Sequence, residues 1–488
     1  MAVRFVLDGQ PVLATDVDPC TTLLQWLRAS GRTAVKEGCA EGECGACAVA
    51  VAARDGHGRA TFESVNSCLA PLFALEGRAV VTSEGVSEPG GVLHAVQQAM
   101  VEHGGSQCGY CTPGFVVSLF CEYYRPGRSG YDPEAISGNL CRCTGYRPIV
   151  EAARSMSLPR VDDPWVQALP RLAPAAPSAL PVEESRHGAG PQPQDECFTG
   201  GGTQVLRPKC LSSALQAIGS HPKATLVAGG TDLIVAANQR GDRWAEVIAL
   251  DAVAELRSFR ESSGELTLGA CLTLSQLEEH LAGCPVKIPL LEQLLPLFSS
   301  RLIRNRATLG GNLATASPIG DSAPVLLALD AQLSLASAGG TRRVALADFF
   351  RSYRRTALGS GELIESICVP LPVRRYQRFY KVSRRVLDDI STVAGAFALD
   401  LDGSKRVAAL RVAFGGVAAT PLRLRDVERV AQGRPWNPET LAILHGALEP
   451  LVAPITDHRG SAAYRKAMTH NLLERFFVET TEATAGES

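Results

Sequence analysis

The stretch GCAEGECGACAVAV, residues 38–51, places Cys39, Cys44 and Cys47 among three glycines and leads directly into an apolar run. A further cysteine, Cys68, follows in SVNSCLAPL. This C-x4-C-x2-C spacing with a fourth cysteine downstream is that of plant-type 2Fe-2S ligation. Glycine suits such a loop because it adopts left-handed conformations and lets backbone N–H groups approach the sulfurs. The alternatives are free thiols and structural zinc, which favours C-x2-C pairs in two separate knuckles.

Alternating apolar residues on either side of this loop predict a small mixed sheet over the first 85 residues, with one helix packed on it. Residues 3–15 alternate around Asp8-Gly9, a hairpin signal. Residues 47–65, CAVAVAARDGHGRATFESV, predict a strand, an Asp-Gly turn and another strand. Between these segments, Thr21 or Thr22 can cap a helix.

A second cysteine quartet consists of Cys108-x2-Cys111 in SQCGYCTPGF and Cys141-x-Cys143 in GNLCRCTGYRPI. Each pair alone is a weak signal, since a C-x2-C pair can be a thiol-disulfide redox centre. Each pair, however, lies in a loop that enters a predicted helix of the segment 85–155, and helix N-termini favour an anionic site. Together the pairs predict a second cluster. The other seven cysteines are interpreted as small buried hydrophobic residues: Cys20, Cys121, Cys197, Cys210, Cys271, Cys284 and Cys368.

Composition bounds the class of protein. The 488 residues are 45% apolar and 20% charged, which is typical of a soluble globular protein of about three domains. The 48 basic and 50 acidic residues are mixed along the chain, so neither a nucleic-acid partner nor a basic binding stripe is expected. No apolar run approaches the roughly 18 residues of a membrane span, and the N-terminus does not resemble a secretion signal. We therefore expect a cytoplasmic protein without a membrane partner, in which 15 cysteines are not a disulfide framework.

Residues 158–194 are rich in Pro, Ala and Ser without a sustained period, which predicts a linker. Beyond it, short apolar runs alternate with helical stretches to about residue 372, and strands followed by helices complete the chain. The predicted parts are 1–85, 86–157, the linker 158–194, 195–372 and 373–482.

Two glycine loops follow the linker. The first, LVAGGTDLIVA at residues 226–236, predicts a strand, a glycine turn and a helix. It is not G-x-G-x-x-G, so a Rossmann site is not indicated, although Gly229 and Gly230 at a helix start suit a pyrophosphate. The second, RNRATLGGNLATASPIGDSAP at residues 304–324, carries small polar side chains that suit phosphate and ribose. The alternatives are a plain strand-turn-helix and a tight surface turn.

The quartet motifs, over about residues 38–148, resemble the iron-sulfur half of the molybdenum hydroxylases, the xanthine dehydrogenase and aldehyde oxidase family. Both glycine loops, in this order, resemble the FAD domain of the same family. The resemblance implies a multidomain α+β fold: a β-grasp 2Fe-2S ferredoxin-like domain, a four-helix 2Fe-2S bundle, an α/β FAD-binding domain of the molybdenum hydroxylase flavoprotein type and a C-terminal α+β flavoprotein lobe. It also implies that Gln107, before Cys108, contacts the pterin, with a helix-end hydrogen bond as the alternative.

The resemblance further implies a set of FAD-binding residues. Phe298 would lie beside the flavin ring, and Lys381, Asp388 and Asp389 would tune flavin charge and nicotinamide access. Core packing explains Phe298 and Leu363 equally well, and solvated charge is the alternative for the other three. The implied FAD residues are Leu226, Val227, Ala228, Gly229, Gly230, Thr231, Asp232, Leu233, Phe298, Thr308, Leu309, Gly310, Gly311, Asn312, Ser317, Asp321, Leu363 and Lys381.

The chain ends at Ser488, without the large molybdenum-binding region of single-chain members, and so resembles the small subunit of bacterial xanthine dehydrogenases. The resemblance implies that electrons from hypoxanthine or xanthine hydroxylation, at the molybdenum cofactor of a separate large subunit, pass through two 2Fe-2S clusters to FAD and on to NAD+. It also implies a heterotetramer of two small and two large subunits, with no catalytic residue in this chain. One alternative is the same relay serving an aldehyde or another N-heterocycle. The other is a non-enzymatic scaffold or assembly protein with an empty flavin fold.

Overall fold

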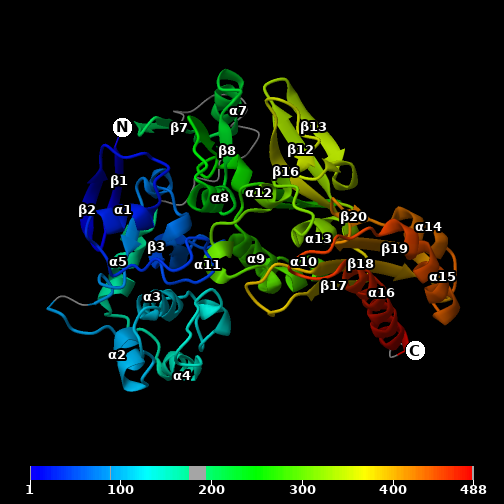
Figure 1. Cartoon of the computed structure of the whole chain (residues 1–488), viewed down its shortest axis with the longest axis horizontal. Coiled ribbons are helices and arrows are strands. Elements are labelled where there is room, and N and C mark those ends of the chain that lie inside the picture. The colour runs from blue at the N-terminus through cyan, green and yellow to red at the C-terminus, as the bar shows by residue number, and fades with distance from the viewer. Residues whose placement is uncertain (1, 88–89, 175–193, 486–488) are drawn as a thin grey trace. The chain divides into compact units, whose positions relative to one another are not determined.

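The structure is a computed structural model that describes residues 2–87, 90–174 and 194–485, and most of its helices and many of its strands are labelled in Figure 1. Two compact units make up the chain. The first unit comprises Met1–Glu255, Thr273–His280 and Ser299–Thr308, and the second comprises Leu256–Leu272, Leu281–Phe298 and Leu309–Ser488. Both units contain helices and sheets, which confirms the predicted multidomain α+β class.

The first unit begins with a mixed five-stranded sheet of order β2-β1-β5-β3-β4. The predicted hairpin forms because Asp8 and Gly9 both take positive φ, 51° and 78°, as a two-residue turn requires. The predicted helix also forms, with the Thr22 hydroxyl accepting the Gln25 N–H at 3.2 Å. The elements are β1 Val3–Leu7, β2 Gln10–Ala14, α1 Leu23–Ala29, β3 Ala48–Arg54, β4 Ala60–Asn66, the short helices η1 Ser67–Leu69 and η2 Leu72–Leu75, and β5 Ala79–Val81.

Strand β3 explains how this sheet is covered on both faces. Its sequence alternates alanine and valine, so that Val49 and Val51 belong to one core and Ala50 and Ala52 to another. The valine side shares its core with the neighbouring four-stranded sheet of the same unit. The alanine side packs against α3, because methyl groups leave room for a helix. The cysteine loop just before β3 therefore lies where both cores meet.

The helical part of the first unit follows the sheet. Cys111 is the N-cap of helix α3, and Pro113 lies in the first turn of this helix. Helix α4 starts after Tyr146, which has a φ of 68°. Both cysteine-bearing loops therefore lead directly into helix N-termini, as predicted. The elements are α2 Ala95–Glu102, α3 Thr112–Tyr123, η3 Pro133–Ile136, α4 Arg147–Ser155 and α5 Pro164–Leu172.

Helix α5 lies within the segment 158–194, for which the sequence indicates no regular structure. The helix forms because the Asp163 carboxylate accepts the Trp165 N–H at 2.8 Å as an N-cap, and the Trp165 ring packs against aromatic rings of β4 and α3. Val166, Leu169 and Leu172 pack into the same core as Trp165, so this short helix has an apolar stripe of about two turns. Residues 175–193 of the predicted linker lie outside the described residues.

A four-stranded sheet of order β6-β7-β9-β8 completes the first unit, with β7 and β8 both parallel to β9. Helix α8 follows β8 through the first glycine loop. Two segments from later in the sequence also join this unit, contributing most of α9 and all of α11. The elements are β6 Glu196–Gly200, β7 Thr203–Arg207, α7 Leu211–Ser220, β8 Thr225–Val227, α8 Leu233–Arg240, β9 Glu246–Ala249, α9 Leu274–Gly283 and α11 Arg301–Arg304.

The second unit contains a five-stranded sheet of order β10-β11-β16-β12-β13 and a small two-stranded sheet. The second glycine loop enters α12, and α13 begins directly after Asp321. The elements are η4 Glu255–Arg257, β10 Phe259–Ser262, β11 Glu265–Gly269, α10 Pro289–Leu294, η5 Leu295–Leu297, α12 Leu309–Ala314, α13 Ser322–Ala328, β12 Gln332–Ser337, β13 Gly340–Ala345, η6 Leu346–Asp348, β14 Phe350–Ser352, β15 Arg355–Thr356 and β16 Leu363–Pro370.

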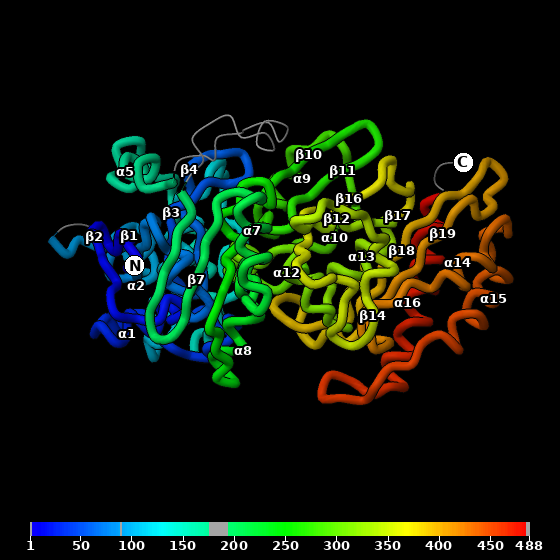
Figure 2. Tube along the Cα trace, turned by 90° about the horizontal axis from the view of Figure 1, so that it is seen from above, coloured from blue at the N-terminus to red at the C-terminus, as the bar shows by residue number. Residues whose placement is uncertain are grey.

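A four-stranded antiparallel sheet, β17-β18-β19-β20, forms the C-terminal part of the second unit. Helix α14 packs on β19 and α16 on β17 and β18, and Figures 1 and 2 place these helices beside the sheet. The core between them includes Phe397 and Phe476, whose rings stack with centroids 5.0 Å apart. The elements are β17 Tyr376–Val382, β18 Val393–Leu401, β19 Val407–Gly415, β20 Leu422–Arg423, α14 Arg425–Ala431, α15 Pro438–Leu448, η7 Glu449–Leu451 and α16 Ala462–Ala485.

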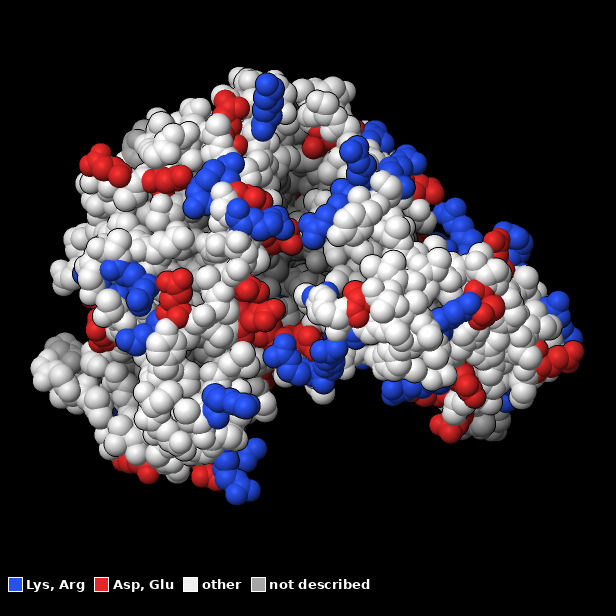
Figure 3. All heavy atoms as spheres, viewed as in Figure 1, with Lys and Arg blue, Asp and Glu red and all other residues white. Residues whose placement is uncertain are grey.

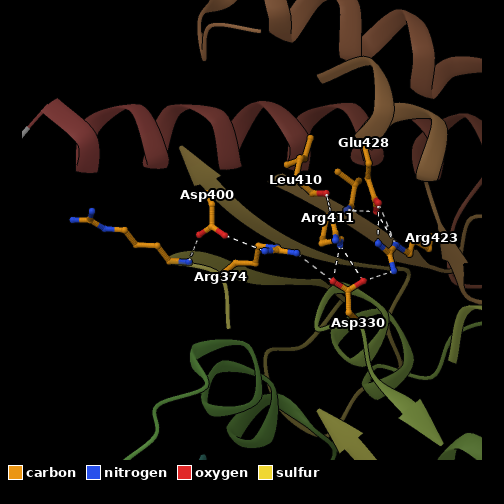
Figure 4. Close-up of polar contacts among 9 residues, drawn as sticks. Asp330, Arg374, Asp400, Leu410, Arg411, Arg423 and Glu428 are labelled. Atoms are coloured by element: carbon orange, nitrogen blue, oxygen red, sulfur yellow. Dashed lines mark hydrogen bonds and ion pairs between the residues drawn. The ribbon is translucent and has the colours of Figure 1, made fainter. Parts of the chain in front are cut away.

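Asp330 ties α13 to this C-terminal sheet (Figure 4). Its carboxylate lies 2.8 Å from the Arg411 guanidinium on β19, 2.6 Å from Arg423 on β20 and 3.5 Å from Arg374. Glu428 pairs with Arg423 at 2.9 Å and completes the network. Three cations around one carboxylate fix the C-terminal end of α13, the helix that begins beside Asp321.

The surface carries charges of both signs, and the face drawn in Figure 3 shows blue and red side chains interspersed. Within the described residues, no helix combines the length and apolarity that crossing a membrane requires.

Candidate functional site

The first cysteine quartet forms two thiol pairs in the structure. Cys39 interacts with Cys44, and Cys47 interacts with Cys68. Hydrogen bonding from Cys44 lowers the pKa of the Cys39 thiol to about 5, and the same bond raises the pKa of Cys44. Likewise, hydrogen bonding lowers the pKa of Cys47 and raises that of Cys68. In each pair, one thiol therefore has a lowered pKa and its partner a raised one.

The backbone of this loop leaves no space for side chains near the sulfurs. A Cβ at Gly38 would lie 2.6 Å from the Cys44 sulfur. Gly42 has a φ of 86°, and a Cβ there would lie 2.5 Å from Leu69. The Glu41 N–H reaches the Cys39 sulfur at 3.4 Å, the kind of contact that stabilises negative sulfur.

The second quartet also forms two pairs, Cys108 with Cys143 and Cys111 with Cys141. The Tyr110 N–H and then the Cys143 thiol lower the pKa of Cys108. Burial, and to a smaller extent the hydrogen bond with Cys141, raises the pKa of Cys111 to about 12. Burial alone would raise the pKa of Cys141 as well, but the hydroxyl and N–H of a neighbouring threonine, at 3.0 and 3.4 Å, lower it.

The two cysteine loops touch each other directly. The Leu140 N–H donates to the Cys44 carbonyl at 3.0 Å, and the Asn139 amide donates to the Gly45 carbonyl at 3.2 Å. A Cβ at Gly45 would lie 2.3 Å from the Gly138 carbonyl oxygen. A single hydrogen bond therefore connects Cys44 of the first quartet to Leu140, the residue next to Cys141 of the second quartet.

Paired thiols fit a two-iron centre. No group of three or more His, Cys, Asp or Glu side chains in the described ranges is arranged to hold a single metal ion. In a 2Fe-2S cluster each iron takes two protein thiolates, because bridging sulfides complete its coordination. The eight candidate cysteines are unbridged thiols in four such pairs, and the N–H groups at their sulfurs suit an anionic cluster. The residues present therefore fit 2Fe-2S clusters.

The first glycine loop, in the first unit, is closely packed against the segment that precedes the second loop. Gly230 has a φ of 78°, and a Cβ at Gly229 would lie 1.9 Å from the Arg306 carbonyl oxygen. The Arg306 guanidinium also donates to the Gly229 carbonyl at 3.0 and 3.2 Å. Burial lowers the pKa of Arg306. The predicted residues Leu226 to Leu233 thus run from β8 through a fixed turn into α8, and Thr308 is buried.

The predicted flavin residues of the second unit include a buried ion pair. The Lys381 ammonium on β17 lies 2.9 Å from the Asp321 carboxylate and donates to the Leu297 carbonyl at 2.8 Å. The Ser391 hydroxyl donates to the other Asp321 oxygen at 2.5 Å. This contact brings Lys381 beside the half-buried Phe298, which follows Leu297 in the chain. A carboxylate, an ammonium and an aromatic ring suit the polar edge and flat face of a flavin.

The other predicted residues of this unit fall into two places. Leu309 and Gly310 are buried at the start of α12, and Gly311 and Asn312 are half-buried there. The Ser322 hydroxyl donates to the Asn312 side chain, which joins α12 to α13. Ser317 lies in the turn between these helices, where its carbonyl accepts the Gly320 N–H at 3.2 Å. Leu363 is instead buried in the five-stranded sheet, paired with Ala336, as the packing alternative expects.

Four family models match this chain in succession. They are a 2Fe-2S iron-sulfur cluster binding domain over residues 5–72, a 2Fe-2S binding domain over 82–154, an FAD binding domain in molybdopterin dehydrogenase over 200–372 and a CO dehydrogenase flavoprotein C-terminal domain over 378–480. The chain belongs to the molybdenum hydroxylase family. The iron-sulfur and FAD-binding domains predicted from the sequence are therefore confirmed.

Named molybdenum hydroxylases align along most of the chain. Xanthine dehydrogenase of Emericella nidulans is 33% identical, over 97% of this chain and 38% of its own length. Xanthine dehydrogenase/oxidase of Gallus gallus is 30% identical, over 97% of this chain and 40% of its own length. The solved structure of quinoline 2-oxidoreductase from Pseudomonas putida 86 is 26% identical, over 57% of this chain and 96% of that one, with a TM-score of 0.52. The chain spans about two fifths of the length of these two curated relatives.

Several side chains that hold the candidate sites were missed by sequence reasoning. Arg306 holds the Gly229 carbonyl, Ser391 holds Asp321, and Asn238 bonds the cysteine loop. Arg306 lies in the segment RNRATLGG that begins the second glycine loop, and a positive charge at this position is a local signal for a contact with a glycine loop. Asn238 and Ser391 carry no local signal, because their partners are far away in the sequence. Gln107, the implied pterin contact, is exposed.

Proposed function

We propose that this chain is the electron-transfer small subunit of a xanthine dehydrogenase. In this proposal Cys39, Cys44, Cys47 and Cys68 hold one 2Fe-2S cluster, and the second quartet holds another. The two glycine loops, with Phe298, Ser317, Asp321, Leu363 and Lys381, bind FAD. A separate large subunit carries the molybdenum cofactor, hydroxylates hypoxanthine or xanthine and joins the chain in a heterotetramer of two small and two large subunits. NAD+ is the electron acceptor.

The observation that carries this proposal is the contact between the two cysteine loops. The hydrogen bond from the Leu140 N–H to the Cys44 carbonyl links residues 96 positions apart in the chain, so only tertiary structure joins the two thiol quartets in this way. Separate scaffolding or zinc sites do not require such contact, whereas a relay does. The names of the full-length relatives favour xanthine as the substrate.

When bound, the two clusters supply single-electron transfer and FAD supplies the change from single electrons to a hydride. The chain's own residues hold these groups. Glycines at positions 38, 42 and 45 let the loop close around sulfur, and the Glu41 and Thr144 N–H groups stabilise thiolate charge. Lys381 and Asp321 form a buried ion pair, which places one donor and one acceptor away from solvent. The proposal includes a cytoplasmic location, because many cysteines without disulfides are typical of a reducing compartment.

Purification of the chain tests its cofactors. We expect a yellow-brown protein with one FAD and about four irons and four acid-labile sulfides per chain, as two 2Fe-2S clusters require. Colourless protein, or about one zinc per quartet, would overturn the relay and favour a scaffold.

Co-purification with the native partner tests the substrate. We expect NAD+ reduction with xanthine and hypoxanthine and little with aldehydes. The solved quinoline 2-oxidoreductase makes an N-heterocycle the informative competitor. NAD+ reduction by quinoline or an aldehyde but not by xanthine would reassign the substrate and leave the relay intact.

A further inference from the structure

Helix α8 runs from the first glycine loop to the first cysteine quartet, and both lie in the first unit. Its first turn follows Gly229 and Gly230, and its eight residues make it about 12 Å long. Its last turn carries Asn238 and Gln239, and both side-chain amides point to cysteine-bearing segments. The helix is therefore a short rigid link between two candidate cofactor sites.

Asn238 uses both of its amide hydrogens on these segments. Its Nδ2 donates to the Ala40 carbonyl at 2.9 Å and to the Cys68 carbonyl at 2.8 Å. Ala40 belongs to the loop that carries three of the four cysteines, and Cys68 is the fourth. A single amide thus joins the two segments that must stay together for the quartet to act as one site. The neighbouring Gln239 amide adds a weaker contact, to the Cys39 carbonyl at 3.1 Å.

The hydrogen bonds from Asn238 should also shift the reduction potential of the cluster in a definite direction. Carbonyl oxygens beside an iron-sulfur cluster place negative potential on it, which disfavours addition of an electron. Amide hydrogens that bind these oxygens offset that potential and favour the reduced, more negative cluster. Within the loop, the Asn66 amide already binds the Gly42 carbonyl at 2.8 Å. Asn238 supplies the same kind of contact from outside the loop.

We infer that Asn238 is a positioning residue for the first cluster. It holds the Cys39 to Cys47 loop and Cys68 in one geometry, sets the reduction potential of the cluster, and ties this geometry to the helix that begins at the flavin loop. This inference rests on the proposed function, and it adds a residue whose role neither the cysteine spacing nor the glycine loops indicate.

Two substitutions test this role in the full chain. Asn238→Ala removes both donors, and Asn238→Asp also places a carboxylate against the two carbonyls. We expect the midpoint potential of the first cluster to fall in both variants, most in Asn238→Asp, with a changed EPR signal for this cluster. We also expect iron from this cluster to transfer to a chelator about tenfold faster. The EPR signal of the second cluster and the FAD content should not change.

Two further variants keep the test informative if Asn238 variants fold poorly. Gln239→Ala removes only the exposed contact with Cys39 and should lower the same potential by less. Asn437→Asp is the matched control for the change of an amide to a carboxylate, because Asn437 is the N-cap of α15 in the second unit and aspartate also caps helices. It should leave both EPR signals and both potentials as in the unmodified chain.

The outcomes separate this inference from the proposed function. If the unmodified chain shows no 2Fe-2S signal, the proposed function fails. If it shows both signals, and the Asn238 and Gln239 variants keep the potential, EPR signal and iron release of the unmodified chain, the inference alone is overturned. A fall in potential that Asn437→Asp reproduces would also overturn it, since the effect would then be one of overall charge.

Discussion

The two cysteine loops each carry thiols of one quartet, but they differ in burial and in the origin of their hydrogen-bond partners. In the first, Cys47 and Cys68 are buried, with 2% and 1% of their surface exposed, and side chains from α8 and β4 bind the loop carbonyls. In the second, Cys108 and Cys143 are exposed, and a threonine within the loop itself supports Cys141. The first quartet is enclosed by side chains from distant elements, whereas the second is partly exposed and is held by its own loops and by their hydrogen bonds to the first loop.

This difference teaches where the glycines are needed. The first loop is packed on several sides, so that an added Cβ at Gly38, Gly42 or Gly45 meets other atoms within 2.6 Å. In the second loop, an added Cβ at Gly145 meets nothing within 4 Å, although Gly145 has a positive φ like that of Gly45. Glycine is therefore required by close packing at the three first-loop positions and only by backbone conformation at Gly145.

The largest expected effect is that of Gly45→Ala compared with Gly145→Ala. Both sites have positive φ, 63° and 66°, which costs alanine about 1 kcal/mol. At Gly45 the methyl group also meets the Gly138 carbonyl, so we expect a total loss of about 3 kcal/mol or more. Chemical unfolding followed by circular dichroism measures this loss. We also expect Gly45→Ala to weaken both EPR signals, since the residue joins both loops; equal losses in the two variants would contradict the packing argument.

Cysteine substitutions test the independence of the two quartets. Cys68→Ser should abolish the EPR signal of the first cluster and lower the melting temperature, because Cys68 is buried. Cys143→Ser should abolish the signal of the second cluster with little change in melting temperature, because Cys143 is exposed. FAD content serves as the control in both variants. Loss of both signals in each variant would show that the quartets do not assemble separately.

Acidification should destabilise the helical part that carries the second quartet. Burial lowers the pKa of His94 from 6.5 to about 4, and its ring lies 2.8 Å from the Tyr124 hydroxyl. Between these pH values the unfolded chain binds a proton on His94 and the folded chain does not. Stability should therefore fall by about 3 kcal/mol as the pH decreases from about 6.5 to about 4, and His94 should contribute no slope above that range.

Unfolding at several pH values measures this slope. His94→Asn keeps a side-chain acceptor at the N-cap of α2 and should flatten the slope. The same slope in this variant would assign the effect to other groups.

Thiol accessibility is the smallest effect and the most direct comparison. In the metal-free, reduced chain, we expect iodoacetamide to modify Cys108 and Cys143 before Cys47 and Cys68, because the first two are exposed. Peptide mass spectrometry over a time course reads each site separately. Early modification of Cys47 would show that the first loop opens without its cluster.

Local signals in the sequence predicted much of the fold. Asp8-Gly9 specified a hairpin, Thr22 a helix start, and the alternation around residues 47–65 a strand pair, because each depends on hydrogen bonds between near neighbours. Helix α5 was missed because its apolar stripe spans only about two turns and contains Pro170, so that it is too short to stand out in a proline-rich segment.

The sequence by itself determined which residues can carry the chemistry, since cysteine spacing and glycine turns reflect local geometry. Only the tertiary structure decided how these residues are held. The contacts that hold them join residues 77 to 198 positions apart in the chain. They are those of Leu140 with Cys44, of Arg306 with Gly229, and of Asn238 with Ala40 and Cys68. Such contacts depend on how sheets and helices pack, and packing is set by the whole core rather than by any short stretch of residues.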